Sequence, residues 1–364
     1  MGLEDWVARA AETLGRNQFD WIEGGAGEEW TLKANRDAFE RWRLRPRMLA
    51  GNAERDLSVE VLGTRSPAPF LVAPIGGQTV VHPEGELATA RAAAATRVPL
   101  IVSTAASHPM EDIARVMGDG PRWYQLYWVS DEEVTESFLE RAQRSGHEAI
   151  VLTVDSPRVG WRDRDLRNAY SPFLEGDGIA QYTSDPVFRS RLAVPPEEDP
   201  AAAGAAVTEM FPNFRVTWSQ LSWLRERTSL PLLVKGILTA EDARMARDAG
   251  IDGVVVSNHG ARQLDGEVAA LDALPEVRAA LGDEATVLMD SGVRRGVDVV
   301  KALALGADAV LIGRPYLYGL AIGGESGVAR VLNGLVAEVD FTLGLIGARD
   351  AASVSRSFVA QAPG

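Results

Sequence analysis

The chain has 364 residues, of which 46% are hydrophobic and 24% charged, a composition typical of a globular protein with a large core. Its formal net charge of -14 repels nucleic acid and anionic membranes, so we expect neither as a partner. The chain has no cysteine, which excludes disulfides, thiolate metal sites and cysteine nucleophiles, and we predict no metal site.

In chain order, the first predicted element is an N-terminal helical segment, residues 1–50, packed on the rest of the molecule. The first six residues lack the basic and apolar stretches of a secretory signal. No apolar run in the chain approaches membrane-spanning length. We therefore expect a cytoplasmic protein.

Eight short apolar runs follow, separated mostly by stretches rich in Ala, Glu and Arg that predict helices. Because the runs are continuously apolar, each predicts a strand that is buried on both faces, as in a parallel sheet covered by helices. Eight strand–helix units predict an α/β fold, a (β/α)8 TIM barrel, in a single domain that spans residues 1–364. A doubly wound sheet is the alternative, although it would usually have fewer repeats. The runs are residues 70–73, 100–103, 123–126, 149–153, 232–235, 254–257, 286–290 and 309–312.

A long insertion, residues 165–217, follows the fourth strand. Its middle, residues 195–200 and the Ala/Gly-rich run behind them, has the composition of a poor core former. A loop of this length predicts either a lid over a site or a disordered surface excursion.

Polar side chains gather at the carboxyl ends of the predicted strands. In a barrel these ends converge on one mouth, where active sites are built. One polar residue after a strand is commonly a turn former, but complementary groups at so many strand ends predict an active site. The residues are Ser103, Gln125, Thr153, Asp155, Lys235, Ser257, His259, Asp290 and Arg314.

The loop after the sixth strand carries His259 and Arg262, three residues apart. Histidine is suited to accept a proton near neutral pH, and arginine holds a carboxylate by two parallel hydrogen bonds. Together they predict chemistry at the carbon next to a carboxylate; the alternative is a loop histidine and a surface arginine with no shared task. Arg162, in a second basic cluster, is predicted to reach the same carboxylate.

The loops after the seventh and eighth strands predict a phosphate site, as is common in barrels. Gly292 and Gly313 let the backbone come close to a ligand, and Arg294 and Arg314 supply positive charge. Asp290 is suited to a polyol, and phosphate plus polyol predicts a cofactor such as FMN. The alternative is that these glycines only end strands or begin helices.

From about Phe19 to Ser355 the chain resembles the FMN-dependent 2-hydroxy acid oxidases and dehydrogenases, which include glycolate oxidase, lactate oxidase and mandelate dehydrogenase. The most specific motif is Ser-Asn-His-Gly-Ala-Arg-Gln-Leu-Asp at 257–265. Residues 55–60 and 184–188 look closest to the lactate 2-monooxygenase branch. Supporting motifs lie at residues 73–76, 82–86, 125–127, 152–155, 233–236 and 290–296.

The resemblance implies catalytic roles for four residues. His259 is the base that takes the proton of the substrate hydroxyl, and Asp155 stabilises the imidazolium that results. Tyr127 donates a hydrogen bond near the substrate oxygen. Lys235 lies beside the N1–O2 edge of the flavin and stabilises the anionic reduced ring. The residues implied to clamp the substrate carboxylate are Arg262 and Arg162.

The resemblance also implies that the cofactor is FMN. Its ring, ribityl chain and phosphate would be held from several strand ends at once. The implied flavin-binding residues are Pro74, Ile75 and Gly76 near N5; Ser103, Gln125, Thr153 and Lys235 at the polar edge; Asp290 at the ribityl chain; Gly292, Arg294, Gly313 and Arg314 at the phosphate; and also Ser257.

Two predicted substrate-binding positions depart from glycolate oxidase. Trp21 stands where the family usually has a Tyr whose hydroxyl helps to bind the carboxylate, and Trp offers an N–H donor but no acceptor. We expect altered carboxylate binding or a reshaped pocket there; the alternative is that Trp21 only packs in the same space. Ala105 stands where glycolate oxidase has a bulky Trp, which leaves room for a larger 2-substituent. Gly76 replaces an Ala that is common near N5.

These features predict oxidation of an (S)-2-hydroxy acid, larger than glycolate, to the 2-keto acid, with oxygen reduced to hydrogen peroxide. The alternatives are oxidative decarboxylation, as in lactate 2-monooxygenase, and a dehydrogenase that passes electrons to a quinone or protein acceptor. A non-redox enzyme on the same barrel and a binding protein with an inactive site also stay open. The expected partners are a small-molecule 2-hydroxy acid and oxygen, and the resemblance implies a homo-oligomer, a tetramer or an octamer.

Overall fold

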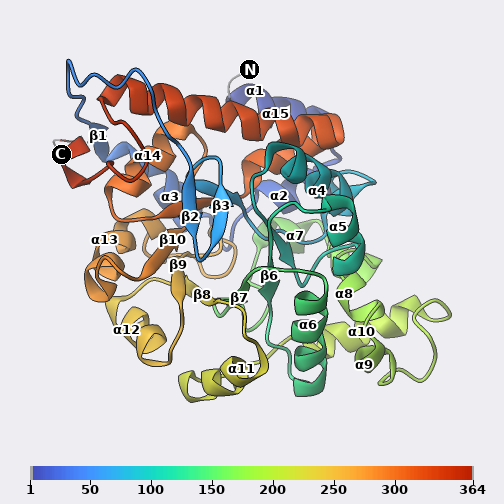
Figure 1. The fold of residues 1–364 in the computed structure, drawn as a ribbon. Helices are drawn as coiled ribbons and strands as arrows, with labels where there is room; N and C mark the ends of the chain where they lie inside the picture. Colours follow the sequence, from blue (N-terminus) through green and yellow to red (C-terminus); the bar gives the residue numbers. More distant parts are fainter. Residues whose placement is uncertain (1–2, 363–364) are drawn as a thin grey trace.

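Eight parallel strands close into a barrel in the computed structural model, which describes residues 3–362 (Figure 1). This confirms the predicted (β/α)8 barrel and excludes the doubly wound sheet. Of the predicted domain, residues 1, 2, 363 and 364 lie outside the described residues. The barrel strands are β4 (Phe70–Val72), β5 (Leu100–Ser103), β6 (Arg122–Leu126), β7 (Ile150–Thr153), β8 (Leu232–Ile237), β9 (Gly253–Val256), β10 (Thr286–Met289) and β11 (Ala309–Ile312).

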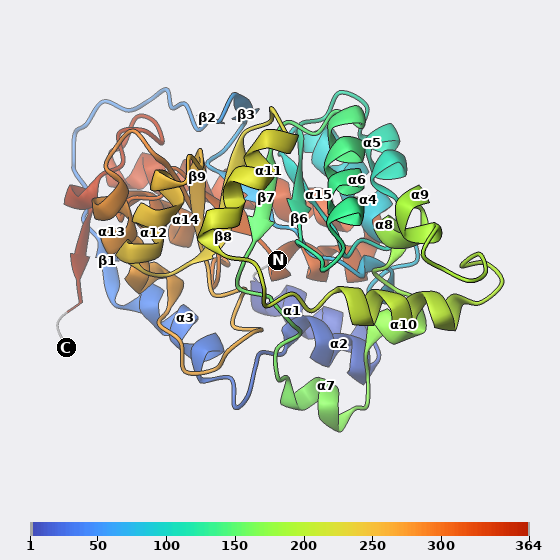
Figure 2. The ribbon, with the colours of Figure 1, turned by 90° about the horizontal axis from the view of Figure 1, so that it is seen from below.

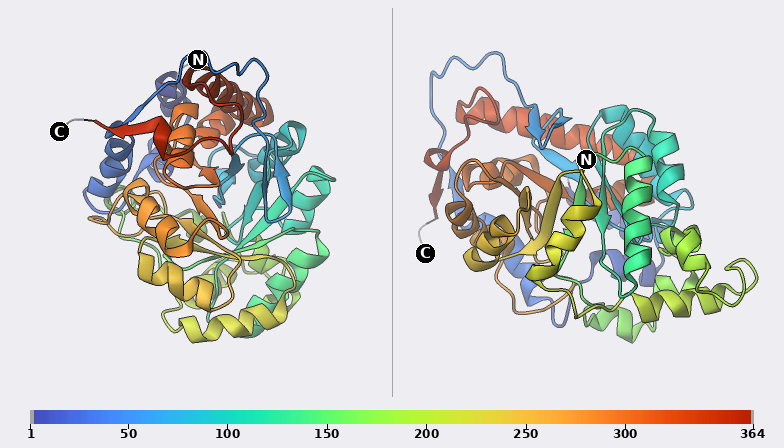
Figure 3. Two further views of the ribbon diagram at one scale, coloured as in Figure 1. Left: turned by 60° about the vertical axis from the view of Figure 1, so that its left-hand side comes forward. Right: turned by 60° about the horizontal axis from the view of Figure 1, so that its bottom comes forward.

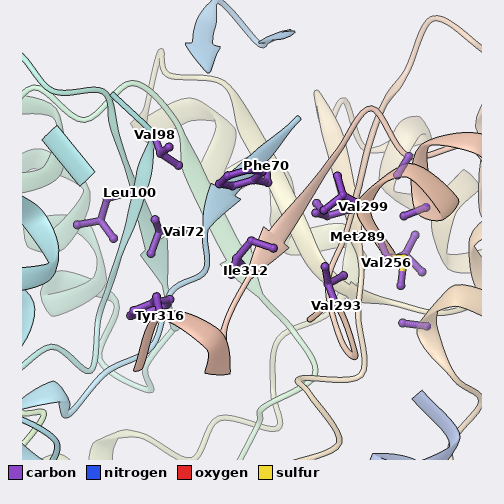
Figure 4. Close-up of a cluster of buried hydrophobic side chains, with 14 of the residues drawn as sticks. Phe70, Val72, Val98, Leu100, Val256, Met289, Val293, Val299, Ile312 and Tyr316 are labelled. Carbon is purple, nitrogen blue, oxygen red and sulfur yellow. The ribbon is translucent and has the colours of Figure 1, made fainter. Parts of the chain in front are cut away.

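Each barrel strand presents alternate side chains to two separate cores, because successive residues of a strand point to opposite faces. In β4, Leu71 belongs to the cluster inside the barrel, whereas Phe70 and Val72 belong to the layer between strands and helices. Figure 4 shows part of that outer layer, where Phe70 and Val72 lie near Ile312 of β11 and Tyr316. Both faces are therefore buried, which explains the continuous apolar runs in the sequence.

Helices surround the strands on the outside (Figure 3). The last one is broken at Gly323 and Gly324, whose backbone angles are not helical. This helix packs along the first helix after β4 and along the N-terminal helix. The surrounding helices are α4 (Gly85–Thr96), α5 (Met110–Met117), α6 (Glu132–Arg144), α11 (Leu221–Arg227), α12 (Ala240–Asp248), α13 (Ala270–Leu281), α14 (Gly296–Ala304) and α15 (Arg314–Ile346).

A hairpin that the sequence did not predict packs against the barrel interior. Its strands, β2 (Val59–Val61) and β3 (Thr64–Ser66), are antiparallel. Val61 joins the cluster of side chains inside the barrel, and the indole N–H of Trp123 donates to Thr64 Oγ1 at 2.8 Å. The hairpin therefore closes the inner core at the end of the barrel opposite the carboxyl ends of the strands. A second unpredicted pairing joins β1 (Trp42–Leu44) to β12 (Val359–Gln361).

The N-terminal segment is helical and packs on the barrel, as predicted. It contains α1 (Leu3–Thr13), α2 (Arg16–Glu23) and α3 (Trp30–Glu40). Seen from below, α2 lies beside α7 (Asp163–Arg167), the first helix of the long insertion (Figure 2). No helix within residues 3–362 is both long and apolar enough to cross a membrane.

The insertion after β7 is built of short helices and is not a disordered excursion. The Ala/Gly-rich run forms a helix in which Ala203, Gly204 and Val207 are buried. Residues 195 and 197–200 before it are exposed, as expected of a poor core former. Small residues let this helix pack closely, and Asp199 caps its first turn by accepting from Ala202 N. After α7 the insertion contains the 3-10 helix η2 (Pro172–Glu175), then α8 (Ala180–Thr183), α9 (Pro186–Arg189) and α10 (Pro200–Met210). The 3-10 helix η3 (Trp218–Gln220) follows the insertion.

The break in α15 yields a test of its packing. A Cβ on Gly327 would overlap the carbonyl oxygen of Gly319, whereas a Cβ on Gly334 of the same helix would meet nothing within 4 Å. We expect Gly327→Ala to lower the free energy of unfolding by about 3 kcal/mol, because backbone cannot yield to the methyl group. Gly334→Ala should raise it by about 0.5–1 kcal/mol, because alanine loses less entropy in a helix. Urea unfolding of both variants measures this, and equal stabilities would contradict the packing.

A second test concerns Glu86, a buried carboxyl at the start of α4. Its Oε1 accepts from Gln78 N and Ser107 N, both at 3.1 Å, while Oε2 has no hydrogen-bond partner among the described residues. Burial outweighs these bonds and raises the pKa of Glu86 from 4.5 to about 7. Between these two values the folded protein holds a proton that the unfolded chain releases, so stability falls as pH rises through this window.

We expect the free energy of unfolding to drop by about 3 kcal/mol from this group between pH 4.5 and pH 8. Glu86→Gln has nearly the same shape and cannot ionise, so it should remove that part of the pH dependence. Urea unfolding of both proteins at several pH values is the measurement. Parallel pH curves for the two proteins would show that Glu86 does not titrate in this range.

Candidate active site

The two-residue alternation of the strands determines which side chains meet at the mouth of the barrel. The interior residue of each strand, such as Leu233 of β8, is followed two positions later by another inward-facing residue, here Lys235. All eight strands do this, so their eight carboxyl-end positions form one ring above the inner core. The ring consists of Ala73, Ser103, Gln125, Thr153, Lys235, Ser257, Asp290 and Gly313.

A cavity of about 590 Å³ lies over this ring. Four of the predicted site residues, Gln125, Thr153, Asp155 and Ser257, do not line the cavity wall. All the others do, so the structure brings most of the predicted residues together around one cavity. The predicted residues in the wall are Trp21, Pro74, Ile75, Gly76, Ser103, Ala105, Tyr127, Arg162, Lys235, His259, Arg262, Asp290, Gly292, Arg294, Gly313 and Arg314.

A chain of alternating charges runs along one side of the cavity. His259 Nδ1 lies 2.8 Å from Asp155 Oδ1, and Lys235 Nζ lies 3.7 Å from Asp155 Oδ2 and 3.3 Å from Asp290 Oδ2. Lys235 also donates to Ser257 Oγ at 2.8 Å. Gly236 permits this arrangement, since a Cβ there would stand 2.7 Å from the Cβ of Asp155.

These contacts decide the protonation of the buried groups. Burial raises the pKa of Asp155, but the charges of Lys235 and His259 and the hydrogen bonds from His259 and Ser156 outweigh it and bring the pKa to about 2. Burial lowers the pKa of His259, Asp155 raises it, and the neighbouring charges of Lys235 and Arg162 lower it, with a net decrease. At neutral pH the arrangement therefore holds a carboxylate against a neutral imidazole. Because Nδ1 faces the carboxylate as a donor, Nε2 is left as the basic nitrogen.

The backbone around His259 adopts the left-handed conformation at three successive residues. The φ angles are 56° at His259, 63° at Gly260 and 63° at Ala261. Side-chain oxygens hold this turn: His259 N donates to Ser257 Oγ, and Gly260 N donates to Ser291 Oγ. Such a conformation in non-glycine residues is unfavourable and persists only where the surroundings fix it, as is common at functional sites.

The two predicted carboxylate-binding arginines lie together on the other side of the cavity. Arg262 Nη1 donates to the backbone oxygens of Trp21 and Gly24 at 2.6 and 2.9 Å, and its guanidinium stands 5.4 Å from the centre of the Trp21 ring. Its Nε and Nη2 have no hydrogen-bond partner within residues 3–362, so they are available to a ligand. Arg162 Nε donates to the backbone oxygen of Arg262 at 3.1 Å.

At the predicted phosphate site, Arg314 makes more hydrogen bonds to the protein than Arg262 does. Arg314 donates to the backbone oxygens of Ile22, Gly24 and Gly260, which uses three of its five N–H groups. Gly292 has a φ of 89°, and a Cβ there would meet the backbone of α3. Arg294 lines the cavity and remains half-buried.

Among the buried polar atoms that lack a hydrogen-bond partner in the described chain, two belong to the ring. They are Gln125 Nε2, a donor, and Thr153 Oγ1, which can donate or accept. Buried polar atoms without partners are uncommon, and two of them in the ring beneath one cavity indicate a ligand there. A donor and a hydroxyl in the ring beneath the cavity, together with the Lys235 ammonium of the same ring, fit the polar, electron-rich edge of a flavin. The residues present therefore fit FMN.

Some residues at the site were not predicted from the sequence. Ser156 Oγ lies 2.9 Å from Asp155 Oδ1 and 3.0 Å from His259 Nδ1. Its position directly after Asp155 was the only signal that could have found it. The insertion also supplies an apolar wall in which Phe211 packs edge-on against Tyr127, with ring centres 5.0 Å apart. No local pattern marks these wall residues, because the chain brings them to the cavity only through the path of the insertion.

Comparisons with known proteins agree with this site. The model of the FMN-dependent dehydrogenase family matches residues 10–361. The chain is 43% identical to an L-lactate oxidase of Lysinibacillus sphaericus, covering 94% of this chain and 88% of the relative. It is 41% identical to glycolate oxidase 1 of Oryza sativa subsp. indica, covering 98% and 94%.

Among solved structures, a mandelate oxidase is 40% identical with a TM-score of 0.88, covering 100% of this chain and 98% of that one. A mandelate oxidase variant solved with a C4a-OH-FMN adduct is 39% identical with a TM-score of 0.86, covering 99% of each chain. Similarity of this extent over nearly the full length identifies both fold and cofactor. The chain therefore belongs to the FMN-dependent dehydrogenase family, as an FMN-containing oxidoreductase of its alpha-hydroxy acid oxidase group.

Proposed function

We propose that this enzyme oxidises an (S)-2-hydroxy acid larger than glycolate to the 2-keto acid, and that oxygen takes up the electrons to give hydrogen peroxide. One observation carries the proposal: a neutral His259, fixed by Asp155, faces the same cavity as the free guanidinium donors of Arg262. A base and a carboxylate clamp across one cavity are what oxidation next to a carboxylate requires. When bound, FMN supplies the acceptor for the two electrons.

Each protein group has a defined task in this proposal. Arg262 and Arg162 bind the substrate carboxylate and so orient the carbon that is oxidised. His259 Nε2 takes the hydroxyl proton, and the carboxylate of Asp155 stabilises the imidazolium that forms. Tyr127 donates a hydrogen bond to the substrate oxygen. Burial lowers the pKa of Lys235, but Asp290 and Asp155 outweigh this and raise it, so a positive charge is kept beside the flavin.

The size of the substrate is proposed from the cavity wall. Ala105 leaves open a place that glycolate oxidase fills with Trp. Around it the insertion supplies Phe173, Tyr182, Val207 and Phe211, an apolar wall suited to an aromatic or branched substituent. Solved relatives are mandelate oxidases, one of them in complex with (S)-4-hydroxymandelic acid. We therefore propose mandelate-like acids as the first substrates to test.

Trp21 gives this substrate a different carboxylate site from that of the tyrosine-containing relatives. Its ring lies between Arg262 and Gly77, whose Cβ would stand 3.4 Å from it. The indole N–H has no acceptor among the described residues, and Trp21 lines the cavity. We propose that it donates to the carboxylate in place of the tyrosine hydroxyl.

Other parts of the assignment stay predictions. Oxidative decarboxylation and electron transfer to a quinone or protein use the same binding groups. Slow reoxidation of the flavin in air would indicate the electron transfer, and a decarboxylated acid as the product would indicate the decarboxylation. The single-domain organisation, the cytoplasmic location, the tetrameric or octameric assembly and the individual flavin contacts, including that of Ser257, also stay predictions.

The chemical step is tested by His259→Gln. Gln keeps a polar group of similar size but cannot act as a base, so the rate of flavin reduction by mandelate should fall by about 10²–10⁴. Anaerobic stopped-flow absorbance measures that rate, and the flavin content of the purified variant serves as the control. Rapid reduction by the variant would remove His259 from the mechanism. Absence of reduction by any 2-hydroxy acid in the unmodified enzyme would overturn the proposed function itself.

The size of the pocket is tested by Ala105→Trp. The indole should fill the space beside Gly76 and Phe173, so kcat/KM for mandelate should fall by at least about tenfold while that for glycolate falls less or rises. Steady-state peroxide formation with both acids measures the ratio. Ala105→Ser, which adds one atom, is the matched control and should keep the preference for mandelate. An unchanged ratio in Ala105→Trp would show that this wall does not limit substrate size.

A further inference from the structure

Three arginine side chains crowd the carboxylate side of the cavity. Burial lowers the pKa of Arg262, and the charges of Arg162 and Arg314 lower it further. Arg162 donates to the backbone of Arg262, and Arg314 and Arg262 both donate to the carbonyl of Gly24, so these guanidinium groups are neighbours. An empty site would therefore hold strong like-charge repulsion unless an anion stands close by.

Asp165 of α7 is the acidic group beside this cluster. Its Oδ2 lies 3.7 Å from Arg162 Nη1, and 16% of its side chain is exposed. Burial raises the pKa of Asp165, the charges of Arg262 and Arg162 lower it, and Asp20 of α2 raises it, with a net increase. The contact with Arg162 is an ion pair at a distance longer than a good hydrogen bond. Asp165 therefore attracts the arginines electrostatically but leaves their N–H donors available to a ligand.

The preceding residue on α7, Arg164, is paired with other carboxylates. Arg164 pairs with Glu29 at 2.6 Å and with Asp20 at 3.3 Å. The charge of Asp20 is therefore already balanced by Arg164. Asp165 is thus the carboxylate left to offset Arg162 and Arg262.

We propose that Asp165 is a resident counter-ion for Arg162 and Arg262, which stabilises the empty site and lowers its affinity for the carboxylate of substrate and product. The inference rests on the proposed carboxylate clamp. A ligand carboxylate brings a second negative charge into the field that Asp165 already occupies, and the two repel one another. Asp165 thereby limits how tightly the anionic product is held.

Two ligands that have nearly the same shape and are not oxidised distinguish the effect of charge on binding from the effect of packing. Phenylacetate carries the carboxylate but lacks the 2-hydroxyl group, so it binds without being oxidised, and phenylacetamide is its neutral counterpart. Each is titrated into the FMN-containing enzyme, and the change in flavin absorbance gives Kd. We expect Asp165→Asn to lower the Kd of phenylacetate about tenfold, the scale of one partly screened charge a few ångströms away. The Kd of phenylacetamide should stay unchanged.

Two further variants complete the design. Asp165→Ser removes the same charge with a smaller side chain and should tighten phenylacetate in the same direction. Asp163→Asn is the matched control, because Asp163 lies two residues earlier on α7 and makes no ion pair with the described residues. It should change neither Kd by more than about twofold, as expected for a half-buried charge without an ion-pair partner. Without ligand, the Asp165→Asn enzyme should unfold at a lower temperature than the unmodified enzyme. Phenylacetate should raise the unfolding temperature of the variant by more than that of the unmodified enzyme.

The outcomes divide cleanly. The counter-ion role is overturned if the Kd of phenylacetate is unchanged or higher in both Asp165 variants. It is also overturned if the Kd of phenylacetamide changes by the same factor. A phenylacetate signal too weak to measure in every protein overturns it as well, because the neutral variants should bind tightly enough to detect. Reduction of the flavin by mandelate is measured in the same preparations. If no 2-hydroxy acid reduces it while the Kd ratio changes as expected, the proposed oxidation fails and the counter-ion role stands.

Discussion

Everything at this site depends on the alternation of side chains along parallel strands in a closed barrel. One residue of each strand fills the inner core, and the residue two positions later must then face the mouth. Closure of the barrel turns eight separate strand ends into one ring, with Lys235 and Asp290 brought within 3.3 Å of each other. Residues far apart in the sequence thus become neighbours without any local signal for contact.

The second constraint is charge balance in a buried place. Lys235 is compensated by Asp155 and Asp290, and the same Asp155 holds His259. An isolated buried charge would be unfavourable, whereas this alternating row keeps the ammonium and the carboxylates ionised. The row therefore gives the chemistry its base and its fixed positive charge together. On the other side, the arginines exceed the acids beside them, which leaves that side ready for an anion.

The parts outside the barrel complete the cavity. The end of α2 supplies the backbone oxygens that orient Arg262 and Arg314. The insertion supplies the apolar wall, and its Asn213 donates to the backbone oxygens of Trp128 and Val129 beside Tyr127. The wall is thereby fixed to the strand loop that carries the tyrosine. A close contact also explains Gly76, because a Cβ there would overlap the backbone of Ala105. The close approach of the two loops that carry Gly76 and Ala105 therefore requires this glycine.

The sequence by itself determined the barrel and most of the site, because continuous apolar runs and polar strand ends are local features that survive in any parallel barrel. It placed His259 and Arg262 correctly on one loop and pointed to the cofactor. Only the tertiary structure decided that Ser156 bridges Asp155 and His259, and that Asp165 faces the arginines. The tertiary structure also showed the hairpin of β2 and β3 and the helices of the insertion, which pack against residues far away in the sequence. Contacts between segments far apart in the chain leave no periodic pattern, so three-dimensional packing alone decides them.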